Sequence, residues 1–371
     1  MRFTIFSHAP HKEFEDKIYS YGPYVREINL WTSSFDEIRI VAPRLKGGVA
    51  PNEYAYDHQH AKLIAIPQLY FKNIPESIKS IFRVIFIIPM IFIEMIGTQH
   101  IHIRCPGNIG LLACIIQIFF PGKKKTVKYA GNWDPRSEQP MSYRFQKWIL
   151  RNRFLTKNAK VLIYGEWEDM KDRKNLIPFY TASFSESDKI EFSKSFQGDF
   201  RFSFLGSLVN GKRPNLAIKI IEQMRSRGHQ VSLDIFGNGP LESALEEYIR
   251  SKALQDVVHL RGVKDVETIK KELQDSHFVI LPSKSEGWPK ALAEGMFFGC
   301  IPIATPVSCV PWMLGYGKRG ILIDPEVNDA TSKIEVFLSD PEKLKKMSEK
   351  STEWARNYTL EKFHESIRKF L

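Results

Sequence analysis

Hydrophobic and polar positions divide the chain into two kinds of segment. Short runs rich in β-branched and aromatic residues alternate with longer amphipathic runs, which is the pattern of strand–helix units in a parallel sheet. In the first half the short runs predict strands over 2–7, 37–43, 61–67, 100–104, 125–130 and 160–165. The helices expected between them include 108–120 and 142–157.

The pattern restarts after a Ser-rich stretch of weak periodicity. Strands are predicted over 200–206, 231–237, 257–262, 277–283 and 301–305, with helices over 214–227, 240–252, 266–274 and 289–298. We therefore expect an α/β protein of two Rossmann-like, doubly wound domains that face each other across a cleft. The expected parts are an N-terminal domain 1–180, a linker 181–199, a C-terminal domain 200–350, and a final helix in 351–371 that can pack back on the first domain.

One stretch, 77–98, has a composition like that of a membrane segment. Only ten uncharged residues separate Arg83 from Glu94, and Pro89 lies among them. A transmembrane helix needs about 20 apolar residues, so this segment is not expected to cross a bilayer alone. We interpret it as a buried helix of the α/β domain; the alternative is a helix that lies against a membrane surface.

Charge is distributed unevenly along the 371 residues. The net charge is +11, of which residues 1–180 carry +10 and the remainder only +1. Residues 121–160 contain eleven Lys and Arg residues but only two carboxylates, and aromatic residues are interleaved with the basic ones. A solvated basic face and an anionic membrane surface both explain this run. No nucleic-acid-binding motif accompanies the charge, so nucleic acid is not an expected partner.

The four cysteines form no C-x-x-C pair, which favours reduced thiols in a cytoplasmic protein.

The segment 281–299, LPSKSEGWPKALAEGMFFG, carries the most chemistry in one place. A predicted strand ends at Ser283, a loop contains Gly287 and Trp288, and Pro289 suits the first position of a helix. Glycine lets backbone N–H groups approach a ligand, and a helix N-terminus adds partial positive charge. The segment therefore predicts a site for an anion or for hydroxyl groups.

Two glutamates, Glu286 and Glu294, accompany this loop. Glu294 lies five residues beyond Pro289, which corresponds to about 7–8 Å along a helix axis. We therefore expect the two carboxylates to enter one pocket at different heights and to bind two separate hydroxyl-bearing groups.

This arrangement resembles the signature of the retaining GT-B glycosyltransferases called group 1, which are glycosyltransferase family 4-like. The resemblance covers residues 200–371, and its landmarks follow in order. They are FLG at 204–206 followed by Lys212, FGNGP at 236–240, LRGV at 260–263, and GKRGIL at 317–322. In the family these segments surround a nucleotide-sugar donor, which is the co-substrate; no further cofactor is implied.

The resemblance implies a role for each matching position. Glu286 and the amides near Gly287 and Trp288 would bind hydroxyls of the donor sugar, and Glu294 would hold the ribose. Lys212 would neutralise the leaving diphosphate, and stabilising such charge is usually the largest catalytic term. The other positions placed around the donor are Gly206, Ser207, Arg213, Gly237, Gly239, Val263, Ser283 and Pro289.

The sequence departs from the family at Ser207, where an Arg is common. Arg213 either compensates for this loss or is a solvated charge at a helix start. The chain contains no Asp-x-Asp, the motif with which another glycosyltransferase architecture binds a metal, and this agrees with a metal-independent reaction.

The first half resembles the family only in layout. Gly22 precedes the first long helix, where the family has an acceptor loop, and Arg104 lies beside the fourth strand. Asn132 and Asp134 occupy the place where the family often has a His, and we expect them to contact the substrates. His102, on an apolar strand, is interpreted as a core residue.

Together these features predict a glycosyltransferase that moves a sugar, with retention, onto a cell-surface polysaccharide or a lipid-linked glycan. We expect it to be cytoplasmic and peripheral on the inner face of the membrane, without a metal. The alternatives are a nucleotide-sugar epimerase or phosphorylase on the same scaffold, and a catalytically inactive sugar-binding subunit.

Overall fold

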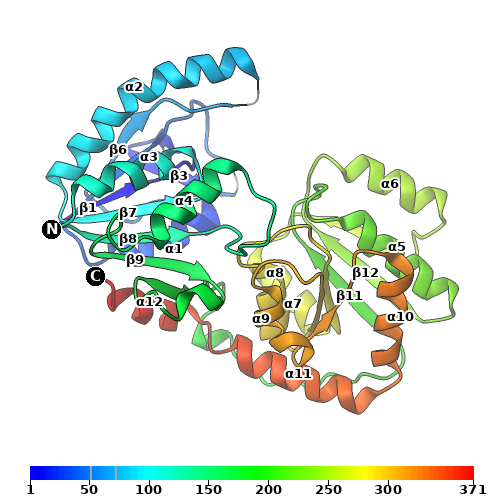
Figure 1. Ribbon diagram of the computed structural model, residues 1–371. Helices are drawn as coiled ribbons and strands as arrows, with labels where there is room; N and C mark the ends of the chain where they lie inside the picture. Colours follow the sequence, from blue (N-terminus) through cyan, green and yellow to red (C-terminus); the bar gives the residue numbers. More distant parts are fainter. Residues whose placement is uncertain (51, 72) are drawn as a thin grey trace. The chain divides into compact units, whose positions relative to one another are not determined.

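A computed structural model describes residues 1–50, 52–71 and 73–371 of the chain. These residues form two compact units: Met1–Phe179 with His364–Leu371, and Tyr180–Phe363. Figure 1 shows each unit as a twisted sheet with helices on both faces. The two units are described separately below.

The first unit is built on a seven-stranded sheet whose paired strands are all parallel. Its central strands have helices on both faces, which explains their near-continuous apolar runs. The strands, in the order in which they lie, are β10 (Leu176–Phe179), β9 (Ala159–Tyr164), β8 (Lys124–Tyr129), β7 (His100–Cys105), β1 (Arg2–Phe6), β4 (Glu37–Pro43) and β6 (Ala61–Ile66).

Four longer helices belong to this unit: α1 (Gly22–Thr32), α2 (Ile74–Gly97), α3 (Asn108–Ile116) and α4 (Met141–Arg151). Helix α2 contacts α3, and α3 contacts α4, so these three form one layer. A small antiparallel sheet joins β2 (Lys12–Phe14), β3 (Lys17–Tyr21) and β5 (Glu53–Ala55). Its strands are too short and too polar to be read from the sequence pattern.

The second unit has a six-stranded parallel sheet. Its strands, in spatial order, are β13 (Val258–Gly262), β12 (Val231–Phe236), β11 (Phe200–Leu205), β14 (Phe278–Leu281), β15 (Ile301–Ala304) and β16 (Ile321–Leu322). Its helices are α5 (Pro214–Ser226), α6 (Glu242–Ser251), α7 (Val266–Asp275), α8 (Lys290–Phe297), α9 (Val310–Met313), α10 (Val327–Leu338) and α11 (Pro341–Ala355), and the chain ends with α12 (Leu360–Arg368).

The structure assigns the expected linker differently, and it places the end of the chain on the first unit, as expected for the final helix. Residues 181–199, expected to form a separate linker, belong to the second unit, because Phe184 and Phe196 in this Ser-rich stretch are buried there. The last eight residues belong to the first unit: Phe370 packs on Phe179, with ring centroids 5.8 Å apart.

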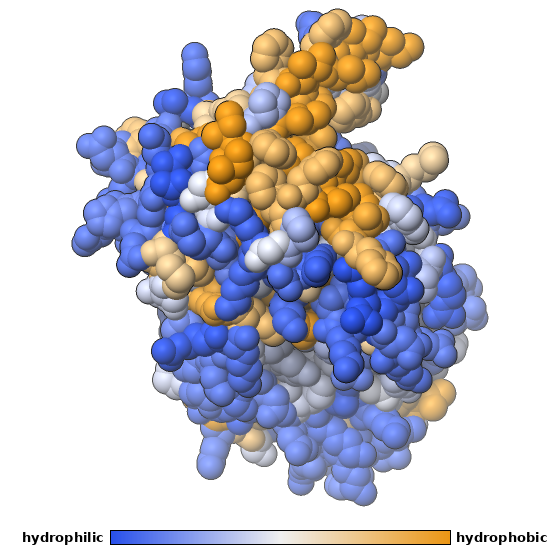
Figure 2. Space-filling model, turned by 60° about the vertical axis from the view of Figure 1, so that its left-hand side comes forward, coloured by the Kyte–Doolittle hydropathy of each residue, from blue (hydrophilic) through white to orange (hydrophobic). Residues whose placement is uncertain are grey.

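Helix α2 is not the buried helix that we favoured. Of its 24 residues only Ser80, Ile87, Ile91, Glu94 and Met95 are buried. Figure 2 shows a continuous hydrophobic band on the face that carries α2. Among the residues that the structure describes, α2 is the one helix long and apolar enough to cross a membrane.

The basic run 121–160 does not form one surface. Lys125, Lys128 and Lys147 are buried, whereas Lys124, Arg153 and Lys160 are exposed. Alternate residues of β8 point to opposite faces of the sheet, and both faces of this central strand are covered. The +9 charge of this segment is therefore divided between the interior and the surface.

Candidate functional site

Loops that follow neighbouring strands meet at the carboxyl edge of the second sheet. Leu208 N, after β11, donates to Asn238 O, after β12, at 2.9 Å. Lys284 N, after β14, donates to Gly211 O at 2.8 Å. The chain leaves β11 toward β12 on one side and later returns to β14 on the other. Open α/β sheets bind ligands at such a switch point.

Glycines allow the first two of these loops to approach closely. Gly237 has a φ of +133°, and a Cβ placed on it would lie 2.1 Å from Gly206 O. A Cβ on Gly239 would lie 2.6 Å from Leu208 O. Side chains at Gly237 and Gly239 would therefore force the loops apart. This explains the two glycines of the FGNGP segment.

An ion pair joins the loops after β11 and β14. Lys212 Nζ donates to Glu286 Oε1 at 2.6 Å. The Glu286 side chain is only 6% exposed, while that of Lys212 is 30% exposed. Arg213, next in the chain, donates from Nη1 to Pro282 O at 3.4 Å. Two cations and a buried carboxylate therefore lie together, an arrangement that can bind a phosphate group and an adjacent hydroxyl.

Side chains that follow β15 hold the loop after β14 through hydrogen bonds. This loop also contains a hydroxyl without a hydrogen-bond partner among the described residues. Thr305 Oγ1 donates to Ser283 O, and Cys309 Sγ donates to Gly287 O at 3.0 Å. Burial, and then the nearby Glu286 carboxylate, raise the pKa of Cys309, which keeps this thiol a donor. Ser283 Oγ is fully buried and has no hydrogen-bond partner among the described residues. A ligand or a water molecule would satisfy it.

Glu294 and the Trp288 ring contact residues outside the Lys212–Glu286 pair. Glu294 Oε1 accepts from Ser183 Oγ at 2.6 Å, so this carboxylate reaches the first residues of the second unit. The Trp288 ring is buried and stacks on Trp354, with centroids 6.0 Å apart. The indole is therefore enclosed in an aromatic cluster.

The remaining donor-side candidates lie in the same loops. Ser207 is exposed directly after Gly206, and Val263 is exposed in the loop after β13. Pro289 is the residue from which α8 begins. Val263 carries no side-chain hydrogen-bonding group, so any polar contact at this position comes from the backbone.

The first unit carries a polar cluster at the carboxyl ends of β7 and β8. Lys128 Nζ lies 2.6 Å from Glu27 Oε1, and Arg104 Nη1 lies 3.9 Å from the same oxygen. The Arg104 guanidinium also stacks over Tyr24, 4.5 Å from the ring centroid. Sequence reasoning found Arg104 and missed Glu27 and Lys128. The available signal was a lysine between the apolar residues Val127 and Tyr129 near the end of β8.

The other candidate residues in the first unit, Gly22, Asn132 and Asp134, form hydrogen bonds with the backbone. Asn132 Oδ1 accepts from Asp134 N at 2.9 Å, and Asp134 Oδ1 accepts from Arg136 N at 2.9 Å. Gly22 N donates to Asn52 O at 2.8 Å at the start of α1. Asn132 and Asp134 thus stabilise the turn after β8.

His102 lies in the core, as interpreted from its apolar strand. Its Nδ1 is 2.9 Å from Thr126 Oγ1, and burial lowers the pKa of His102 to about 3.

Comparison with known proteins identifies relatives of the second unit. Residues 185–354 match the family model described as glycosyl transferases group 1. The putative colanic acid biosynthesis glycosyltransferase WcaL of Salmonella typhimurium is 34% identical over 129 residues, which are 33% of this chain and 31% of WcaL. The amylovoran biosynthesis glycosyltransferase AmsK of Erwinia amylovora is 29% identical over 148 residues, 38% of this chain and 36% of AmsK. The chain thus spans about a third of the length of each of these relatives.

Solved structures resemble the whole chain. HepE of Anabaena, in complex with UDP and glucose, superposes with a TM-score of 0.69 at 12% identity, covering 100% of this chain and 98% of that one. This likeness shows that the chain has the GT-B fold, as the sequence predicted.

Proposed function

Residues 185–354 form a group 1 glycosyl transferase domain, and from this premise we propose that the protein transfers a sugar from a nucleotide-diphosphate donor. The observation that carries the proposal is the Lys212–Glu286 pair at the switch point of the second sheet. It combines a partly exposed cation with a buried carboxylate, which suits a diphosphate joined to a sugar.

Each part of the donor has a complementary group in the site. The diphosphate binds Lys212 and the N–H groups of the glycine loops, with Arg213 as a second cation. Glu286 accepts hydrogen bonds from hydroxyls of the sugar, and the Ser283 hydroxyl, buried without a partner among the described residues, provides a further contact. Glu294 binds the ribose after its present bond to Ser183 opens.

The reaction proceeds with retention and without a metal or a further cofactor. The acceptor hydroxyl attacks the anomeric carbon from the face of the leaving group as the bond from that carbon to the diphosphate oxygen breaks. The hydroxyl proton passes to the leaving diphosphate, whose developing negative charge Lys212 stabilises. The protein then needs no separate catalytic base.

The acceptor is a growing polysaccharide or a lipid-linked glycan at the cytoplasmic face of the membrane. The biosynthetic roles in the names of WcaL and AmsK support this class of acceptor. We assign acceptor binding to the first unit, where Arg104 and the turn at Asn132–Asp134 offer charged and amide groups and where Gly22 begins α1.

A donor panel tests this function. The protein is incubated with nucleotide sugars, and release of the nucleoside diphosphate is followed with and without a membrane lipid extract. We expect release that requires the extract. Glu286→Gln should lower kcat/KM about 10²–10³-fold, because the charged acceptor for hydroxyls of the reacting sugar is lost. Glu246→Gln, on the exposed face of α6, is the matched control and should leave turnover unchanged.

Binding measurements separate the two residues of the pair. Lys212→Gln should weaken binding of both UDP and UDP-glucose, whereas Glu286→Gln should weaken only the sugar-bearing ligand. Undiminished turnover in Glu286→Gln would refute the assigned site. Turnover without any acceptor would favour an epimerase, and binding without turnover would favour an inactive sugar-binding subunit.

A further inference from the structure

Helix α2 has the reverse of the polarity expected for a surface helix. Ser80, Arg83 and Glu94 lie on the side that packs against the first unit, and each has a hydrogen-bond or ion-pair partner there. Glu94, for example, lies 3.0 Å from Arg39 of β4. In a water-facing amphipathic helix such residues would point outward.

The outward side of α2 is apolar from residue 80 to its carboxyl end. From residue 80 to residue 97 each exposed side chain of the helix is Ile, Phe or Pro: Ile81, Phe82, Ile85, Phe86, Ile88, Pro89, Phe92, Ile93 and Ile96. The apolar surface continues onto Phe119 of the 3₁₀ turn that follows α3 (Gln117–Phe119); its ring centroid lies 6.5 Å from that of Phe92. A helix of 24 residues is about 36 Å long.

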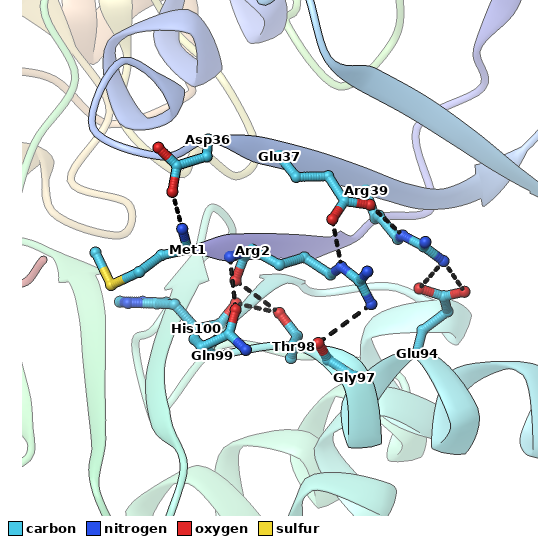
Figure 3. Close-up of polar contacts among 10 residues, drawn as sticks. All are labelled: Met1, Arg2, Asp36, Glu37, Arg39, Glu94, Gly97, Thr98, Gln99 and His100. Atoms are coloured by element: carbon cyan, nitrogen blue, oxygen red, sulfur yellow. Dashed lines mark hydrogen bonds and ion pairs between the residues drawn. The ribbon is translucent and has the colours of Figure 1, made fainter.

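Polar contacts fix the carboxyl end of α2 to the sheet (Figure 3). Arg39 bonds Glu94, and Arg2 Nη1 donates to Gly97 O at 3.2 Å. Lys123 Nζ donates to Ile96 O at 2.6 Å. Crossing a bilayer would require α2 to leave these partners. Whatever covers the apolar side of α2 must therefore bind it while the helix remains packed along its length on the first unit.

A cationic cavity lies at the same edge of this unit. Strand β8 begins at Lys124, directly after Lys123. A cavity beside the start of this strand has a volume of about 520 Å³. Its lining includes Lys124, Arg153, Lys157, Lys160 and Lys174, and no Asp or Glu is among the described residues that line it. Figure 1 places the carboxyl end of α2 and the starts of the strands at one end of the first unit. An apolar surface therefore borders a concentration of positive charge.

We propose that α2 is a monotopic membrane-binding helix whose apolar side enters the interface of an anionic phospholipid bilayer. The basic cavity meets the headgroup phosphates at the carboxyl end of the helix. Interfacial helices bury their apolar side about 5–10 Å deep, and nearby Lys and Arg side chains add attraction to anionic lipid. Phosphate groups also match the lysines and arginine of the cavity chemically.

A second copy of the chain explains this surface less well. Protein interfaces carry about one hydrogen bond per 100–200 Å² and a polar rim. Beyond Lys79 the described exposed side of α2 offers no side chain that can donate or accept a hydrogen bond. Self-association through α2 would also bring two cationic cavities close together, and their positive charges would repel each other. An anionic bilayer instead neutralises the positive charge of the cavity.

This inference deepens the proposed function by identifying the surface on which a lipid-linked acceptor is met, and that link rests on the proposed function. Membrane binding itself requires neither donor nor acceptor. Flotation of the protein without turnover would therefore refute the proposed function alone, and turnover without flotation would refute the inference alone.

Vesicle flotation of the full chain tests the inference, with phosphatidylcholine vesicles and with phosphatidylcholine–phosphatidylglycerol vesicles. The wild type should bind both and prefer the anionic mixture. The double variant Ile85→Glu/Phe86→Glu should bind at least about a hundredfold more weakly to both, because two apolar side chains lose their burial in lipid. Val336→Glu, at a position 64% exposed on α10, is the control and should bind like the wild type.

The cavity is tested separately by Lys157→Gln/Lys160→Gln. Binding to the anionic vesicles should fall about thirtyfold, since each basic side chain near the surface contributes roughly 1 kcal/mol, while binding to phosphatidylcholine should not change. Lys345→Gln/Lys346→Gln on α11 is the matched control. Thermal unfolding checks that each variant is folded.

Two outcomes would overturn the inference. One is undiminished flotation of the folded Ile85→Glu/Phe86→Glu variant. The other is a wild-type protein that does not float but forms a concentration-dependent dimer that this variant abolishes, which would assign the surface to a second copy.

Discussion

Replacing Gly237 by alanine tests the idea that two loops must approach each other closely to form the donor site. The added Cβ would lie 2.1 Å from Gly206 O, and ordinary carbon–oxygen contacts are about 3.3 Å. The loops after β11 and β12 would therefore have to separate by about 1 Å. The φ of +133° at Gly237 adds backbone strain to this steric conflict.

Both effects contribute to the expected loss of stability. Strain at a glycine-only conformation costs about 1–3 kcal/mol, and overpacking adds about 1–3 kcal/mol. We expect Gly237→Ala to lower the free energy of unfolding by about 2–6 kcal/mol. A displacement of about 1 Å in a site that positions its ligand can cost about a hundredfold, so nucleotide binding should fall by a factor of that order.

Gly228→Ala is the matched control. Gly228 also has a positive φ, +91°, but nothing lies within 4 Å of its Cβ position. This variant should lose only about 1–2 kcal/mol and should bind nucleotide like the wild type. Urea unfolding gives the stabilities, and calorimetric titration with UDP and with GDP gives the affinities. Wild-type stability in Gly237→Ala would refute the steric argument. Equal nucleotide affinity in the two variants would show that the close approach serves the fold and not the donor.

Two further predictions concern buried charge in the first unit. Burial lowers the pKa of His102 to about 3, below an unfolded value near 6.5. Its contribution to stability is therefore complete above about pH 6.5, is lost as pH falls toward 3, and has decreased by about 2 kcal/mol at pH 5. Burial also lowers the pKa of His100 and His11, so every variant should lose stability between pH 7 and pH 5. Urea unfolding should show a loss about 2 kcal/mol smaller in His102→Gln than in the wild type and in His60→Gln, an exposed control; identical pH dependence in all three proteins would contradict it. For the buried Lys128–Glu27 pair, Lys128→Met and Glu27→Gln should each cost about 3–5 kcal/mol, and the double variant less than their sum; strictly additive losses would exclude the pairing.

The strand–helix alternation predicted most of the two parallel sheets within a residue or two. The strand expected over 37–43 matches β4 (Glu37–Pro43), and the strand expected over 231–237 matches β12 (Val231–Phe236). Such strands are covered on both faces, so their apolar runs are visible without knowledge of their neighbours. The edge strand β10 was missed, because its four residues, Leu-Ile-Pro-Phe, are too few for a period and include a proline.

The candidate site was predictable where backbone geometry determines residue type. The need for glycine at positions 237 and 239 follows from close loop approach, and the lysine and glutamate of the ion pair lie at fixed places after two strands. Side-chain direction was not predictable. Glu294 faces Ser183, which lies 111 positions away in the chain, and no local pattern encodes such a contact.

Helix α2 shows why hydrophobic composition alone misassigns a helix. Apolar residues surround its axis, a pattern shared by core helices and by helices in contact with lipid. The informative residues are the few polar ones, and their direction depends on partners far away in the chain, such as Arg39, which lies 55 positions before Glu94. Once those partners turn the polar residues inward, the opposite side has no protein layer over it among the described residues. Contact of that apolar side with water is unfavourable, and burial in a bilayer removes this contact. The resulting gain in free energy favours binding to a bilayer.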